Sequence, residues 1–84
     1  MVRLETKFGA ADSLTPEIAA KLAHRASHSQ ASVSLVYGGR VLRLDSLIGI
    51  LSVQMLRGSV LTVMAEGLDE KVAAADIRNM IAGN

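Results

Sequence analysis

Two hydroxyl side chains in this 84-residue chain, Thr15 and Ser46, stand where phosphate chemistry could take place. Each precedes an apolar segment that is expected to begin a helix, where free backbone amides can hold an anion. A threonine hydroxyl is a poor nucleophile without an adjacent base, and the nearest histidine, His24, is two or more helical turns away. Thr15 is therefore predicted to cap a helix, and Ser46 is a second candidate for a capping hydroxyl.

Two histidines, His24 and His28, are four residues apart, a spacing at which two imidazoles on one helix could bind a metal. No third ligand follows nearby, so the sequence favours solvated surface residues and indicates no metal and no cofactor. Lys21 and Arg25 share the helical face of His24 and make that face basic.

The length and composition predict a single domain and argue against a protein that binds nucleic acid or membranes. Eighty-four residues predict one domain, residues 1–84, which buries roughly 60–65% of its unfolded surface. Half of the residues are apolar, but only Phe8 and Tyr37 are aromatic, so the chain lacks a stacking platform for bases. The net charge of +1 gives no long-range field toward nucleic acid or an anionic membrane.

The sequence also indicates the cellular compartment of the protein. It contains no cysteine, which excludes disulfides and thiolate metal sites. No apolar run approaches the ~20 residues of a membrane span, and the alternating N-terminal segment carries an acid, unlike a signal peptide. We therefore expect a cytoplasmic protein that does not bind membranes.

The elements that must position these residues follow from hydrophobic periodicity. Alternation predicts four strands over residues 2–8, 32–37, 40–44 and 59–66. Three- and four-residue spacing predicts helices over residues 16–27 and 70–82. A short apolar segment behind a capping hydroxyl predicts a short helix over 45–51, although it is too brief to show a periodicity. Pro16 suits the first turn of its helix, Asp69 is expected to cap the last one, and Gly38-Gly39 predicts a two-residue hairpin turn.

These elements indicate an α+β fold: a four-stranded antiparallel sheet with all helices on one face. In the last strand, Leu61 and Val63 are expected to face the helices. Val60 and Met64 are expected on the opposite, open face.

Three segments carry a resemblance to a known family: SLTPEIAA (13–20), DSLIGILS (45–52) and AEGLDE (65–70). Together with the element order, they resemble the phosphocarrier protein HPr family of the bacterial phosphotransferase system. The resemblance spans the chain and implies an open-faced β-sandwich.

The first segment departs from the family pattern, G-L-H-A-R-P-A-A, at its chemical centre. Thr15 occupies the position of the phosphorylated histidine, and Pro16, Glu17 and Ile18 replace alanine, arginine and proline. A neutral imidazole is a nucleophile near pH 7 and its phosphoramidate is a ready donor, whereas a threonine phosphate ester is a poor donor. Glu17 repels an anion that the family's arginine would bind. We expect no histidine phosphotransfer and no enzyme activity.

The second segment matches the family at its regulatory serine. The resemblance implies that Ser46 is phosphorylated by HPr kinase/phosphorylase and that the modified protein then binds a transcription regulator in carbon catabolite regulation. It also implies an apolar docking patch formed by outward residues of this segment, with Leu47, Ile48 and Leu51 as candidates. The basic face that includes Lys21 and His24 would meet acidic partner proteins beside Thr15 and Glu17.

Three functions are therefore open. The first is an HPr-like regulatory and protein-interaction domain without histidine phosphotransfer. The second is a true phosphoryl carrier that receives phosphate from Enzyme I. The third is a structural or oligomerisation module, for example a homodimer that forms through Val60 and Met64 on the open face of the sheet.

Overall fold

The structure, a computed structural model, describes residues 1–44 and 54–83. Its strands and helices are β1 (Val2–Lys7), α1 (Pro16–Ser27), β2 (Ala31–Tyr37), β3 (Arg40–Arg43), β4 (Val60–Gly67) and α3 (Glu70–Ala82). Each begins and ends within one residue of the predicted position. The predicted short helix over 45–51 lies outside the described residues.

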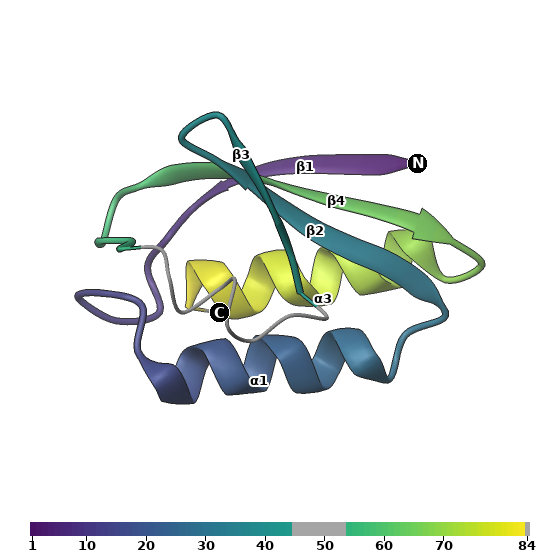
Figure 1. Cartoon of the computed structure of the whole chain (residues 1–84), viewed down its shortest axis with the longest axis horizontal. Coiled ribbons are helices and arrows are strands. Elements are labelled where there is room, and N and C mark those ends of the chain that lie inside the picture. Colours follow the sequence, from purple (N-terminus) through teal and green to yellow (C-terminus); the bar gives the residue numbers. More distant parts are fainter. Residues whose placement is uncertain (45–53, 84) are drawn as a thin grey trace.

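The four strands form one antiparallel sheet in the order β1-β4-β2-β3. β4, the last strand in the chain, lies in the middle and pairs with both β1 and β2. α1 and α3 lie side by side below one face of this sheet, and the other face is open (Figure 1). The predicted α+β open-faced sandwich is confirmed.

A glycine pair makes the hairpin between β2 and β3. Gly38 and Gly39 have φ angles of 59° and 78°, the left-handed conformation that both central residues of a type I′ turn require. Residues with a Cβ atom adopt this conformation at a cost, so the predicted turn has a direct conformational cause.

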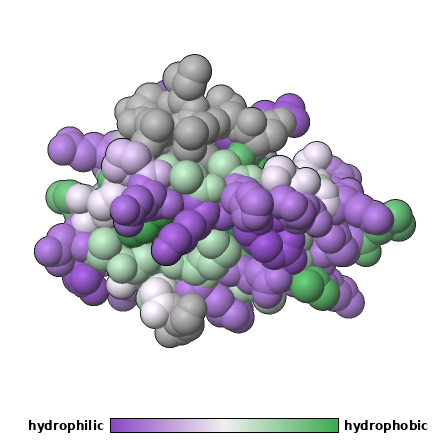
Figure 2. All heavy atoms as spheres, turned by 90° about the horizontal axis from the view of Figure 1, so that it is seen from below, coloured by the Kyte–Doolittle hydropathy of each residue, from purple (hydrophilic) through white to green (hydrophobic). Residues whose placement is uncertain are grey.

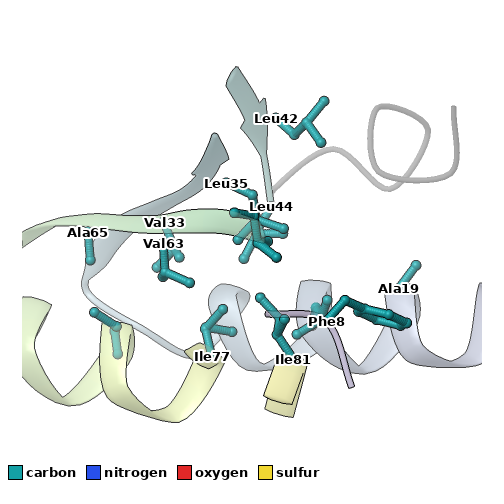
Figure 3. Packing of buried hydrophobic residues seen from close by; sticks show 14 of the residues in the cluster. Phe8, Ala19, Val33, Leu35, Leu42, Leu44, Val63, Ala65, Ile77 and Ile81 are labelled. Carbon is teal, nitrogen blue, oxygen red and sulfur yellow. The ribbon is translucent and has the colours of Figure 1, made fainter. Parts of the chain in front are cut away.

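The core lies between the sheet and the two helices. Leu61, Val63 and Ala65 of β4 point toward the helices and are buried, as are Ile77 and Ile81 of α3. Figure 3 shows these layers facing one another, with Val63 and Ile77 pointing into the space between sheet and helix. The predicted inward and outward faces of β4 are both confirmed, since Val60 on the open face is 52% exposed.

One predicted cap is wrong. Asp69 occupies the position before α3, but its side chain makes no capping hydrogen bond. Its carboxylate instead accepts from the Ser29 hydroxyl at 2.9 Å and from the Gln30 backbone N–H at 3.2 Å. These bonds tie the turn between α1 and β2 to the start of α3, and the bond from Ser29 is the main cause of the lowered pKa of Asp69.

In residues 1–44 and 54–83, neither helix is long enough and apolar enough to cross a bilayer.

Candidate functional site

The tip of α1 is closed by its own capping residue. Thr15 has extended backbone angles (φ −104°, ψ 161°), and its Oγ1 accepts a hydrogen bond from the Ile18 N–H at 3.2 Å. The Thr15 carbonyl accepts from the Ala19 N–H at 2.9 Å, which begins the regular helical bonding. The predicted cap is confirmed.

This cap reduces what the helix tip can offer to an anion. An uncapped α-helix presents several free N–H groups at its start, and these groups bind phosphates. Here Pro16 has no N–H, and the Ile18 N–H is already bonded to Thr15. Of the first three residues of α1, only Glu17 keeps an N–H that is neither missing nor bonded to the cap. Glu17 is exposed and carries a negative charge of its own.

The loop before Thr15 is held against the end of α3. The Gly9 and Ala10 N–H groups both donate to the Ile81 carbonyl, at 2.9 and 3.1 Å. The backbones are so close that a Cβ atom on Gly83 would lie 2.8 Å from the Gly9 oxygen. Bonds to the last carbonyls of a helix satisfy acceptors that have no partner within it. The end of α3 therefore helps to fix where α1 begins.

The same loop is bonded on its other side to residues 55–57. The Leu14 N–H donates to the Met55 carbonyl at 2.8 Å, and the Arg57 N–H donates to the Asp12 carbonyl at 2.9 Å. The Arg57 guanidinium lies 3.4 Å from the Asp12 carboxylate. The sequence does not indicate that Arg57 lies near the site, because no local pattern links it to the loop before Thr15.

The outer face of α1 carries the residues predicted to meet protein partners. Lys21 and His24 are exposed there, and Glu17 is exposed at the tip. Arg25, expected on the same basic face, is turned toward α3, where its guanidinium bonds the Asp76 carboxylate at 2.7 Å. The exposed cationic charge of this face is thus smaller than the sequence indicates.

A shallow groove runs along this side of the molecule. It is lined largely by carbon atoms of α1 residues and of Met80 from α3. Figure 2, a view from the helix side, shows hydrophilic side chains around a paler apolar strip. The arrangement offers an apolar contact strip with a charged rim. Ser46, Leu47, Ile48 and Leu51 lie outside the described residues, so the structure does not place them relative to this groove.

Comparison with known proteins identifies the family. The family model described as the PTS HPr component phosphorylation site matches residues 5–83. The chain belongs to the HPr family. Phosphocarrier protein HPr of Buchnera aphidicola is 32% identical over 73 residues, which cover 87% of this chain and 86% of that protein.

Solved structures agree with the fold. The phosphocarrier protein HPr of Bacillus anthracis superposes with a TM-score of 0.89 at 22% identity, covering 95% of each chain. The catabolite repression protein Crh of Bacillus subtilis has a TM-score of 0.75 at 26% identity, covering 96% of this chain and 86% of that one. The chain thus has the scaffold of an HPr phosphocarrier, a protein class that carries phosphate and does not itself catalyse a metabolic reaction.

Proposed function

We propose that this protein is an HPr-like regulatory domain that binds other proteins in the cytoplasm and does not carry phosphate on a histidine. The observation that supports this proposal is the closed tip of α1, where the Thr15 side chain bonds the Ile18 N–H at 3.2 Å. In the family pattern, a histidine stands at position 15 and is followed by alanine and arginine. The alanine N–H and the arginine side chain can both support a phosphoryl group, and here proline and glutamate replace them.

A phosphotransfer assay tests the loss of carrier function. We expect no acid-labile phosphate on the chain after incubation with phosphoenolpyruvate and Enzyme I, with the HPr of Bacillus anthracis as the positive control. The combined variant Thr15→His, Pro16→Ala, Glu17→Arg, Ile18→Pro should gain labile phosphate, because it restores the nucleophile, the amide and the cation together. Labile phosphate on the unaltered chain would overturn the proposal.

We further propose that phosphorylation of Ser46 controls partner binding, as in HPr-like proteins that act in carbon catabolite regulation. The motif DSLIGILS and the similarity to Crh support this step. HPr kinase would transfer the γ-phosphoryl group of ATP to the Ser46 oxygen and release ADP and a proton. The added charge of about −1.5 to −2 would then be available to pair with cations of a partner.

Intact mass spectrometry after treatment with HPr kinase and ATP tests this step. We expect one phosphoryl group on the unaltered chain and on Thr15→Ala, and none on Ser46→Ala. A chain that takes up no phosphate, or takes it up equally in Ser46→Ala, contradicts the proposal.

The proposed docking surface combines the outer face of α1 with the apolar segment after Ser46. Its members are Thr15, Glu17, Lys21, His24, Leu47, Ile48 and Leu51. An acidic partner, such as a transcription regulator, fits the exposed ammonium group of Lys21 on α1. We expect Lys21→Glu to weaken binding of the phosphorylated protein to such a regulator, as measured by surface plasmon resonance. Lys7→Glu on β1 should not weaken it.

A second candidate function is a structural module that forms a homodimer. Val60 and Val41 are 52% and 61% exposed, and both belong to the open face of the sheet through their pairing with β1 and β2. The solved Crh is itself a dimer with a swapped domain. Light scattering over a dilution series should show dimers that Val60→Lys abolishes if this candidate is right, and monomer throughout if it is wrong.

A further inference from the structure

Two imidazole rings lie next to each other at the end of α1. His24 belongs to the last turn of the helix and His28 is its C-cap residue. Both side chains are exposed, and their ring centroids are 4.4 Å apart with the planes tilted by 50°. Sequence spacing alone could not establish this contact, because it depends on α1 keeping its helical course up to His28.

The backbone selects the tautomer of His28. Its Nδ1 lies 2.9 Å from the His24 carbonyl oxygen, which can only accept a hydrogen bond. Nδ1 therefore carries the hydrogen in the neutral ring, and the Nε2 lone pair is available. Metal-binding histidines are commonly oriented in this way, with one ring nitrogen bonded to a backbone carbonyl and the other on the metal.

The spacing of the rings suits a shared ion. A tetrahedral metal about 2.0–2.1 Å from each of two nitrogens holds these nitrogens about 3.3 Å apart. The ring centroids are 4.4 Å apart, so the two imidazoles already lie close enough for one nitrogen of each to approach the same ion. The groove beside the pair leaves room for an ion and its other ligands.

The charged groups near the two histidines leave only a small net positive charge beside the pair. On α1, Lys21 and Arg25 lie along the same groove, and Arg25 is neutralised by Asp76 of α3 at 2.7 Å. The negative end of the α1 dipole lies beside the pair and favours a cation there. Within residues 1–44 and 54–83, no cluster of three or more His, Cys, Asp or Glu side chains could hold a metal alone. The pair can therefore supply two ligands and leaves two positions open.

We propose that His24 and His28 together bind one divalent late transition-metal ion, such as Zn²⁺ or Cu²⁺. The two open coordination positions accept water or a carboxylate or imidazole of another protein molecule. This function is separate from the proposed loss of phosphotransfer and from phosphorylation of Ser46, because it uses neither Thr15 nor Ser46.

Calorimetric titration of the full chain without an affinity tag, with ZnCl₂ and separately with CuCl₂ near neutral pH, tests the site. We expect saturable binding that weakens by about tenfold or more in both His24→Gln and His28→Gln. The control Lys71→Gln, at an exposed position of α3 outside the groove, should bind as well as the unaltered chain. A stoichiometry of one ion per chain or one per two chains supports the site equally, because the open positions can be filled by water or by a second copy.

A further readout separates metal ligation from a structural effect of the substitutions. Zinc should shift the imidazole proton signals of both histidines together in NMR spectra. Zinc binding that is unchanged in both glutamine variants, or no saturable binding at millimolar metal, would overturn the proposal.

Discussion

At the residue scale, Thr15 and Pro16 act on the same small group of backbone donors. The Thr15 hydroxyl uses the Ile18 N–H, and the proline ring removes the donor at the first helical position. The two residues stabilise the helix and at the same time reduce its ability to bind an anion. Thr15 and Pro16 thus favour the folded helix and disfavour the binding of a phosphoryl group at its start.

We expect Thr15→Ala to lower the free energy of unfolding by about 0.5–2 kcal/mol, because the Ile18 N–H loses its partner. Thr15→Ser keeps an oxygen acceptor and should stay close to the unaltered chain. Urea denaturation followed by circular dichroism measures both. Equal stability of the alanine variant and the unaltered chain would show that the cap does not contribute.

Asp69 supports a prediction about pH. Its pKa lies below its ordinary value of 3.8, mainly because the Ser29 hydroxyl donates to the carboxylate. A carboxyl group whose pKa is lowered by folding stabilises the folded protein above its unfolded pKa, and this contribution disappears as the pH falls through the folded pKa.

We therefore expect Ser29→Ala to raise the pKa of Asp69 toward the ordinary value and to flatten the loss of stability as the pH falls below about 4. NMR titration of the Asp69 carboxyl carbon measures the first effect, and urea denaturation at several acidic pH values measures the second. Ser29→Thr, which keeps the donor, is the control. An unchanged titration in Ser29→Ala would assign the lowered pKa to other contacts.

At the scale of elements, the boundaries could be predicted from sequence and the contacts between elements could not. Alternation, the Gly38-Gly39 pair and the Thr15-Pro16 start are local signals, and the structure confirms each of them. The Asp69 carboxylate bonds Ser29, forty residues earlier in the chain. No local sequence pattern distinguishes this distant bond from a helix cap, because an aspartate carboxylate can accept a hydrogen bond in either arrangement.

The ion pair between Arg25 and Asp76 is another such contact, since its members are 51 residues apart and join α1 to α3. Their side chains are 26% and 47% exposed. A double-mutant cycle with Arg25→Gln and Asp76→Asn should give a coupling energy of about 0.2–1 kcal/mol, because solvent screens a pair of this exposure. A coupling energy of zero would mean that the helices are held by apolar packing alone.

At the scale of the whole molecule, one thin core supports every feature described above. Phe8 is the largest side chain in that core and is 1% exposed. It directly precedes the loop that leads to Thr15, so its packing fixes both the sheet and the start of α1. A domain of 84 residues typically has a free energy of unfolding of about 4–13 kcal/mol.

We expect Phe8→Ala to lower the free energy of unfolding by about 3–5 kcal/mol, a large part of the total. Phe8→Leu, which leaves a smaller cavity, should lose less. Thermal denaturation followed by circular dichroism compares the two variants. If the alanine variant unfolds at nearly the same temperature as the unaltered chain, the core is able to collapse around the missing ring.

The strand order has a consequence for synthesis on the ribosome. β4 pairs with both β1 and β2 and begins at Val60. It is therefore synthesised after both of its partner strands. A nascent chain that ends before this residue can close the β2–β3 hairpin but has no partner for β1. The sheet therefore assembles only after β4 has been synthesised, and until then the apolar residues of β1 stay accessible to chaperones.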